Sequence, residues 1–319
     1  MVFGMAALLP SVQCSSIPIF HSPKPSSKKS SKIVALCAMN QHRPVESQMS
    51  RALELLSVFP HILASQKDIL STVISTADHR LGSLLHPSSF SVPPDVESYQ
   101  SASGSSLGFL NINRGVDASP IDFLLTSCMH LTLPSSSTMN IVTLQGQLKP
   151  ITDAPHFVME VCHLSPSNVL VSLDLTPRKD LILHSDYLKE FYEDGGLEKC
   201  RKAFYERIPE AEPYLSSSMH IRSVMSPTGI LAMVKCGDRI EEILREGVMP
   251  AVAEVARIWT EKCVGERRVS EEERREIERR DLMLKKKSVE IDLAPKLPSI
   301  FGNDVAQRVI GVISTVFGT

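Results

Sequence analysis

The pattern that most constrains the fold of this chain is a run of strand-like segments joined by very short connectors. Five stretches rich in apolar and β-branched residues follow one another: Leu107–Asn113, Ile121–Leu133, Met139–Leu148, His156–Leu164 and Asn168–Leu175. The connectors hold only three to seven residues, whereas a parallel crossover needs about a dozen or more. The sequence therefore predicts an antiparallel meander of five strands.

Helical patterns lie on both sides of this meander. Apolar spacing and capping residues mark Ser50–Val58, Gln66–Leu85, Ser185–Asp194, Leu197–Ile208, a long region from Asp238 that Pro250 should interrupt or restart, a charged helix from the capping pair Ser270 and Glu273 to about Lys287, and a last helix capped by Asn303 or Asp304. A second strand pair is predicted at Met219–Met225 and Ile230–Cys236, and a loop at His86–Ser106. This order predicts an α+β sandwich around a largely antiparallel sheet.

The composition excludes several classes of protein. The 319 residues are 43% hydrophobic and 22% charged, with a formal net charge of −2, which leaves no basic footprint for nucleic acid. No apolar run reaches the roughly 18 residues of a membrane-spanning helix. The seven cysteines have neither a CxxC pair nor zinc-ligand spacing, so we expect buried thiols in a reducing compartment.

The first forty residues differ from the rest of the chain. They are rich in serine and carry four lysines, and no acidic residue occurs before Glu46. This composition is typical of an organelle transit peptide, and Ile33–Ala38, which ends in small residues, is typical of a plastid processing region. A merely disordered tail is the alternative. We expect residues 1–40 to be a disordered plastid transit peptide and residues 41–319 to form a single domain.

One carboxylate lies in a segment that is apolar on both faces. Alternation along the predicted strand places Phe157, Met159 and Val161 on one face, and Val158, Cys162 and Leu164 beside Glu160 on the other. A strand that is apolar on both faces is usually covered on both. A carboxyl buried there is either paired with a cation or raised in pKa, so that it can deliver a proton near neutral pH. The pattern leaves open an edge strand with Glu160 in water.

Motifs for common cofactors are absent from the sequence. It has no GxGxxG after a predicted strand and no GxxxxGK[ST], so the usual dinucleotide and triphosphate sites are not predicted. The string Gly104–Gly108 matches GxSxG, but a loop precedes it and a strand follows, whereas a nucleophile elbow needs a strand before it and a helix after it. The histidines form no ligand set of the HExxH kind. Any chemistry then depends on acids and histidines that act on a substrate with its own reactivity.

Three further acids lie among apolar neighbours. Asp122 and Asp174 could be strand-end acids that pair with arginine or lysine. Asp292 lies between a lysine run and two prolines, Pro295 and Pro298. We expect that segment to be a loop rather than a long helix, either exposed or folded over a pocket as a lid.

Several longer stretches resemble one family over essentially the whole chain after the first forty residues. They are Ser119–Phe123, Ala154–Glu160, Pro177–Leu181, Asp186–Glu190, Ile221–Ser223 with Ser226-Pro227, Asp238–Arg245, Glu273–Asp281 and Phe301-Gly302. Colinear matches of this length are more specific than a short motif. Through them the chain resembles red chlorophyll catabolite reductase, a plastid enzyme family of chlorophyll breakdown that is related in fold to the ferredoxin-dependent bilin reductases.

The resemblance implies an α/β/α sandwich, in which helices flank both faces of a central, mainly antiparallel sheet and a tetrapyrrole pocket lies at one face. It implies an oxidoreductase that reduces red chlorophyll catabolite, an open-chain tetrapyrrole, to the primary fluorescent catabolite. Reduced ferredoxin would supply single electrons, and the protein would bind no cofactor of its own. The expected location is the chloroplast stroma, and a homodimer is expected by analogy.

The resemblance also assigns roles to individual residues. Glu160 and Asp292 match the essential acids of the family, so we expect Glu160 to be the main proton donor and Asp292 to orient the substrate or relay a proton. His220 stands where relatives place an apolar side chain near the substrate, and it is either a further proton source or a spectator. Arg222 shares a face with His220 on the predicted strand and binds a substrate propionate or forms a surface salt bridge.

Two further expectations concern the electron donor and the competing functions. Ferredoxins are acidic, so the basic runs Lys285–Lys287 and Arg178-Lys179 are candidate docking residues, although charge runs are usually just solvated. A tetrapyrrole carrier that sequesters the pigment without reducing it is the alternative function. A biliverdin-like substrate is another possibility.

Overall fold

The computed structural model describes residues 48–86, 92–133, 136–263 and 269–319, so the predicted transit peptide at 1–40 lies outside the described residues. Its centre is one sheet with the strand order β1-β2-β3-β4-β5-β6-β8-β7. The strands are β1 Ser98–Gln100, β2 Leu107–Arg114, β3 Ile121–Thr132, β4 Thr138–Leu148, β5 His156–Ser165, β6 Asn168–Thr176, β7 Ala211–Pro213 and β8 Ile230–Lys235. Every neighbouring pair is antiparallel. The meander β2–β6 predicted from the short connectors is confirmed.

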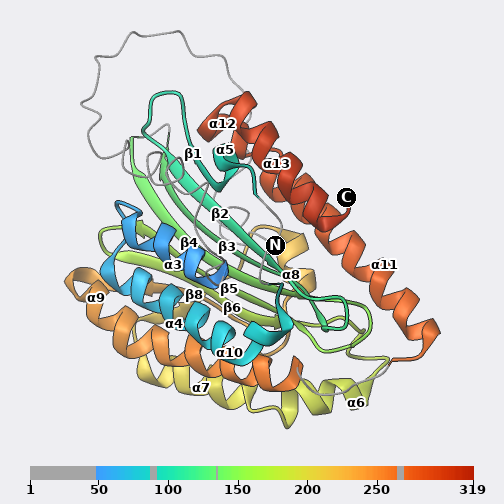
Figure 1. Ribbon diagram of the computed structural model, residues 1–319. Coiled ribbons are helices and arrows are strands. Elements are labelled where there is room, and N and C mark those ends of the chain that lie inside the picture. The colour runs from blue at the N-terminus through green and yellow to red at the C-terminus, as the bar shows by residue number, and fades with distance from the viewer. Residues whose placement is uncertain (1–47, 87–91, 134–135, 264–268) are drawn as a thin grey trace.

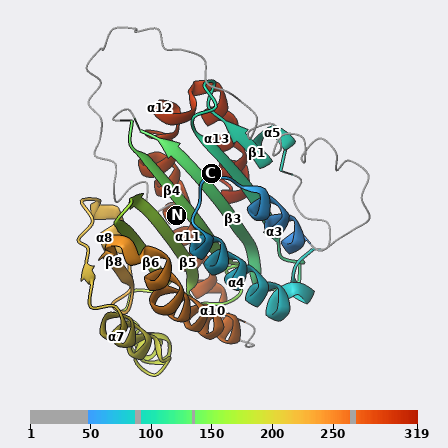
Figure 2. The ribbon, with the colours of Figure 1, turned by 90° about the vertical axis from the view of Figure 1, so that its left-hand side faces the viewer.

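Helices cover both faces of the sheet (Figures 1 and 2). One layer, which we call the α4–α10 layer, contains α3 Gln48–Val58, α4 Ala64–Leu81, α6 Ser185–Leu188, α7 Leu197–Arg207, α9 Ile240–Glu242 and α10 Met249–Cys263. The other, the C-terminal layer, contains α5 Pro94–Glu97, α8 Met219–Val224, α11 Glu271–Ser288, α12 Leu297–Phe301 and α13 Asn303–Phe317. The expected α/β/α sandwich with a mainly antiparallel sheet is therefore confirmed.

Strand alternation sends side chains into two separate apolar cores. On β5, Phe157, Met159 and Val161 pack against the α4–α10 layer, whereas Val158 and Cys162 pack under the C-terminal layer. This is the division predicted from the sequence. Because β5 lies between β4 and β6, it is an interior strand, and the alternative of an edge strand with its acid in water is wrong.

The predicted strand Met219–Met225 is instead the short helix α8. The Ser218 side chain caps it by accepting a hydrogen bond from the Ile221 backbone N–H at 3.4 Å. Ile221 and Val224, three residues apart, are buried on one side of the helix. The alternation of apolar and polar residues in this segment led to the prediction of a strand. The capping serine is the sequence signal that favours a helix.

The segment around Asp292 is helical rather than the predicted loop. Helix α11 passes directly into a π-helical turn, Val289–Leu293. The two prolines that suggested a loop come after this turn, and Pro298 lies in the first turn of α12, where a missing N–H costs nothing. The long predicted loop His86–Ser106 also contains structure, since α5 and β1 lie within it.

The remaining helix boundaries agree with the sequence in most places. Ser270 and Glu273 form the predicted capping box of α11, and Pro250 lies in the first turn of α10, directly after the π-helical turn Ile243–Val248. The last helix is capped by Gly302, rather than by Asn303 or Asp304.

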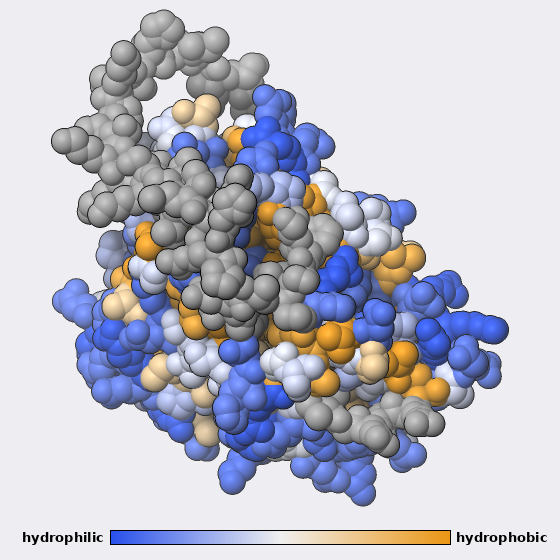
Figure 3. All heavy atoms as spheres, viewed as in Figure 1, coloured by the Kyte–Doolittle hydropathy of each residue, from blue (hydrophilic) through white to orange (hydrophobic). Residues whose placement is uncertain are grey.

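Three further observations concern the described ranges. No helix there is long and apolar enough to cross a bilayer. The molecular face in Figure 3 is largely hydrophilic, with hydrophobic residues gathered in small areas. The cysteines that the structure describes as free thiols, Cys128, Cys162, Cys200 and Cys236, are all buried.

Candidate active site

Glu160 is a fully buried acid at the middle of the sheet. Its relative exposure is 0%, and its strand neighbours are Thr143 on β4 and Ser172 on β6. The Thr143 hydroxyl donates to Oε2 and the Cys162 thiol donates to Oε1, each at 3.3 Å. Burial, reinforced by the charge of Glu160, raises the pKa of the Cys162 thiol well above its ordinary value, so this thiol remains a donor. Glu160 is thus held rigidly beneath the C-terminal layer.

Asp292 approaches the same face of the sheet from the C-terminal layer. It lies on the π-helical turn with 1% relative exposure. Its Oδ1 atom has no hydrogen-bond partner among the residues that the structure describes. Burial raises the pKa of this carboxyl to about 7, against the opposing charge of Lys296. An acid with such a pKa can hold a proton at neutral pH and also release it.

Lys296 links the two predicted acids electrostatically. Burial lowers the pKa of its amine, while the negative charges of Asp292 and Glu160 both act to raise it. A single partly buried cation therefore lies in the field of both carboxyls. The two acids that the sequence resemblance had paired, 132 positions apart in the chain, therefore both act on Lys296.

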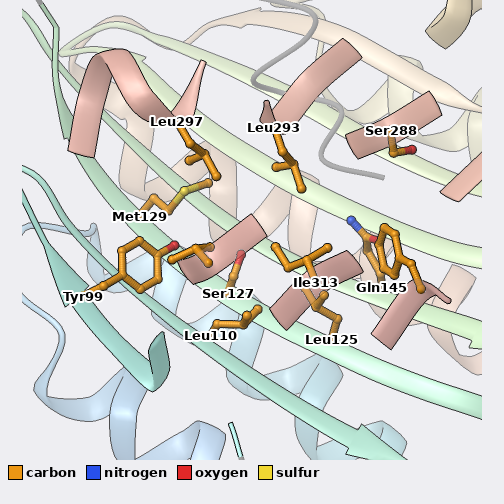
Figure 4. A pocket seen from close by; sticks show the side chains of 12 residues that line it. Tyr99, Leu110, Leu125, Ser127, Met129, Gln145, Ser288, Leu293, Leu297 and Ile313 are labelled. Carbon is orange, nitrogen blue, oxygen red and sulfur yellow. The ribbon is translucent and has the colours of Figure 1, made fainter. Parts of the chain in front are cut away.

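A narrow cleft lies on this side of the sheet (Figure 4), and its free volume is only about 20 Å³. Its lining is mostly apolar with a few polar groups, and comprises Tyr99, Leu110, Leu125, Ser127, Met129, Gln145, Ser288, Leu293, Leu297, Val309, Ile313 and Phe317. Ser127 pairs with Thr143, which pairs with Glu160, so the cleft floor and Glu160 lie in one row across the strands. A mostly apolar lining with a few polar groups is typical of a small-molecule site. Within the described ranges no group of side chains is suited to hold a metal ion.

A second buried polar cluster lies near the acids, and we call it the clamp. It consists of Arg178, His156 on β5 and Asp281 on α11. Arg178 donates to both oxygens of Asp281 through Nε and Nη2, and its Nη groups also donate to the carbonyl oxygens of residues 148, 149, 152 and 154. His156 Nε2 lies 3.0 Å from Asp281 Oδ1. The clamp therefore joins strand β5, which carries Glu160, to helix α11, which leads to Asp292.

The proton on His156 is fixed by its two neighbours. The Leu148 backbone N–H donates to Nδ1 at 3.1 Å, so the single proton of the neutral ring lies on Nε2 and is donated to Asp281. Burial lowers the pKa of His156 to about 4, and the ring is neutral at physiological pH. The pKa of Asp281 is held below its ordinary value because the attraction and hydrogen bonds of its partners outweigh its burial. Asp281 is consequently a permanent anion.

The clamp changes the interpretation of the basic runs proposed for ferredoxin docking. Arg178 is 1% exposed, so its assignment to a docking surface is wrong. Lys179 is mostly buried against Asp153 and Glu273. Lys285 is mostly buried against Asp122. Within these two runs, Lys286 and Lys287 are the more exposed side chains, and both pair with Glu290.

His220 and Arg222 do not share a face, because α8 is a helix and residues two apart point in nearly opposite directions. The His220 ring is half-buried, and Nε2 has no hydrogen-bond partner in the described part of the chain. Burial lowers its pKa, with a smaller effect from the charge of Lys287. Arg222 is exposed. The geometry that had supported a propionate contact is therefore lost, whereas His220 remains near the end of α11.

The other two acids have different environments. Asp122 pairs with Arg114 and Lys285, as expected of a strand-end acid. Asp174 is buried and accepts hydrogen bonds from the Ser226 N–H and hydroxyl instead of from a cation. Burial raises the pKa of Asp174 to about 6.

Comparison with known proteins identifies the family. The family model of red chlorophyll catabolite reductase (RCC reductase) matches residues 65–315. The chain belongs to the red chlorophyll catabolite reductase family. It is 38% identical over 310 residues to "Red chlorophyll catabolite reductase, chloroplastic" of Arabidopsis thaliana, covering 95% of this chain and 96% of that protein. It is 40% identical over 261 residues to "Red chlorophyll catabolite reductase 1, chloroplastic" of Oryza sativa subsp. japonica, covering 80% and 78%.

The fold comparison agrees with this membership. The crystal structure of phytochromobilin synthase from tomato in complex with biliverdin superposes with a TM-score of 0.61 at 16% identity, covering 79% of this chain and 82% of that one. At this identity the likeness shows the fold alone. The expectation of an oxidoreductase of the red chlorophyll catabolite reductase family with a bilin-reductase fold is confirmed.

Proposed function

We propose that this protein reduces red chlorophyll catabolite to the primary fluorescent catabolite, using reduced ferredoxin as the electron donor. Two electrons and two protons are added across a carbon link between two neighbouring pyrrole rings. The conjugated pigment accepts the electrons one at a time, so the protein must bind it, orient it and supply protons. Family membership supports the reaction, and the orphaned Oδ1 of buried Asp292, in the layer that covers the Glu160 face of the sheet, is the observation that supports this site.

The two acids divide the proton chemistry. Each electron makes the pigment more basic, and an acid within hydrogen-bond reach can then protonate it. Glu160 is the main donor because its strand and its two hydrogen bonds fix its position. Asp292, with a pKa near neutrality, orients the substrate or relays a second proton. His220 is a further candidate for contact with the pigment, and Arg222 is a candidate for its propionate.

The cellular setting follows from the same proposal. Residues 1–40 act as a plastid transit peptide, and the mature protein works in the chloroplast stroma, where ferredoxin is reduced. Relatives in Arabidopsis thaliana and rice are named chloroplastic. We also propose a homodimer, which sedimentation velocity would test.

The deciding experiment is anaerobic turnover with reduced ferredoxin and red chlorophyll catabolite. Loss of red absorbance with growth of blue fluorescence is expected for wild-type protein. Glu160→Gln is expected to bind the pigment but to turn it over roughly 10²-fold more slowly or worse, the scale of a positioned proton donor. Binding without any turnover in the wild type would instead favour a sequestering protein. Faster turnover of biliverdin in the same assay would favour a different bilin substrate.

A further inference from the structure

Tyr99 lines the cleft, in a position that requires glycine at residue 108. On β1 it pairs with Gly108 of β2. A Cβ atom on residue 108 would lie 2.3 Å from Tyr99 Cζ, so the phenol ring can lie over β2 only because residue 108 has no side chain. The ring also meets Phe301 of α12 edge to face, with centroids 5.0 Å apart. Sheet and C-terminal layer thus fix the ring together.

The Tyr99 hydroxyl borders the cleft. The side chain is 7% exposed and lines the cleft, and Figure 4 shows its oxygen pointing into that space. No hydrogen bond to this hydroxyl occurs within the residues described. Buried tyrosines usually find a partner, as the Tyr187 hydroxyl does by accepting from the Arg178 N–H and the Tyr192 hydroxyl by donating to the Leu175 carbonyl oxygen. Because burial raises the pKa of Tyr99 far above 10, its hydroxyl remains a proton-bearing donor.

The position of this donor relative to the acids suggests the shape of the ligand. Glu160 lies on β5 and Ser127 on β3 in the same row, so two strand spacings separate them, roughly 10 Å. The Tyr99 ring lies over β2, one strand further on. A molecule that meets both Tyr99 and the acids must therefore be long, with a hydrogen-bond acceptor at the far end. An open-chain tetrapyrrole has this form, because its terminal rings carry carbonyl oxygens.

We propose that Tyr99 is a pigment-binding residue, whose hydroxyl donates a hydrogen bond to a carbonyl oxygen at the end of the tetrapyrrole remote from Glu160. The proposal rests on the proposed function for the class of ligand. It assigns Tyr99 to affinity and orientation rather than to proton transfer, and Gly108 to the placement of the ring. Gly108, the last residue of the GxSxG string, then has a structural role, because its missing side chain lets the Tyr99 ring lie over β2.

The test is anaerobic titration of the full chain with red chlorophyll catabolite, followed by pigment absorbance, for wild type, Tyr99→Phe and Gly108→Ala. Loss of one net hydrogen bond predicts a rise in the dissociation constant of about three- to tenfold for Tyr99→Phe. At pigment concentrations well below the dissociation constant, turnover should fall by the same factor. Gly108→Ala is expected to weaken binding at least as much, because it displaces the ring.

The matched control is Tyr192→Phe, which removes a buried hydroxyl that already has a partner on the opposite face of the sheet. It should lower the thermal midpoint and leave the pigment dissociation constant unchanged. Tyr99→Phe should do the reverse, since no hydrogen bond of the free protein is lost. An affinity of Tyr99→Phe within twofold of wild type would overturn the proposal even if wild-type turnover is normal. Weaker pigment binding by Tyr99→Phe, in a protein that never turns the pigment over, would support Tyr99 and reject the reductase function.

Discussion

Asp281 and Asp292 lie eleven residues apart on one helical segment, and both are buried. Asp281 accepts hydrogen bonds from Arg178 and His156, and its pKa is lowered. Asp292 has an oxygen with no partner in the described residues, and its pKa is raised to about 7. The satisfied acid holds the structure together, whereas the unsatisfied acid is available to a ligand. Burial alone does not distinguish the two roles, but hydrogen-bond satisfaction does.

The largest expected effect is on the stability of an Asp281→Asn variant. Removing the anion leaves Arg178 buried without a countercharge, and breaking such a pair costs about 3–5 kcal/mol. Urea denaturation should show this loss in the free energy of unfolding. The control is Asp122→Asn, because the Asp122 carboxylate and its partner Arg114 are both partly exposed, and this change should cost about 1 kcal/mol or less. Equal losses in the two variants would mean that the clamp has no special role.

Asp292→Asn should lower activity and not stability, in contrast to Asp281→Asn. No hydrogen bond to Oδ1 is lost and a charge disfavoured by burial is removed, so the free energy of unfolding at pH 7 is not expected to fall. Turnover should fall roughly 10²-fold, which corresponds to about 2.7 kcal/mol of activation free energy. Stopped-flow reduction of the pigment under anaerobic conditions measures this turnover rate. Unchanged turnover would remove Asp292 from the proton chemistry.

The two aspartates should also respond to pH with opposite signs. The folded-state pKa of Asp292 is raised, so its stabilising contribution is complete below its unfolded pKa of about 3.9 and is lost as pH rises through 7. The folded-state pKa of Asp281 is lowered, so its contribution is present above about 3.9 and is lost as pH falls through the folded value.

Urea denaturation of wild type and Asp292→Asn between pH 5 and 8 tests the pH dependence predicted for Asp292. The stability of wild type relative to the variant should fall by up to about 1.4 kcal/mol per pH unit below pH 7 and level off above it. Wild-type turnover should decline above pH 7 as the acid loses its proton. A pH-independent stability difference would contradict the raised pKa.

The smallest effect is expected for Arg222→Ala. Arg222 is exposed on α8, so any charge interaction with a pigment propionate is screened by water and contributes about 1 kcal/mol or less. The dissociation constant for the pigment should rise by about fivefold at most, with little change in turnover. An unchanged dissociation constant would rule out the propionate contact, and a much larger rise would mean that α8 moves over the bound pigment.

The sequence predicted those parts of the fold that short-range patterns determine. Strand alternation and short connectors placed β2–β6 nearly to the residue, and the capping box of α11 was visible in Ser270 and Glu273. The family resemblance supplied Glu160 and Asp292. The alternation in β5 also assigned Glu160 to the correct face, because a period of two applies wherever the strand lies.

Features that depend on distant partners could not be predicted in this way. Arg178 has the local sequence of a surface residue, and only its contact with Asp281, 103 positions away, makes it a core residue. Tyr99 lies in a segment rich in proline and serine, which predicted a loop. The packing of its ring over Gly108 arises only because β1 pairs with β2. The six residues of α8 fit both the period of a strand and the period of a helix. The burial of Ile221 and Val224, three residues apart, agrees with the helix.

The π-helical turn at Val289–Leu293 determines the direction in which Asp292, the proposed second acid, leaves the helix. Such a turn holds one residue more than an α-helical turn, and each α-helical residue advances by about 100° around the axis. Deleting one residue there would leave Asp281 anchored while swinging Asp292 about a quarter of a circle away from the sheet. A change of a single codon could therefore turn the carboxyl that we propose as the second acid away from its present position.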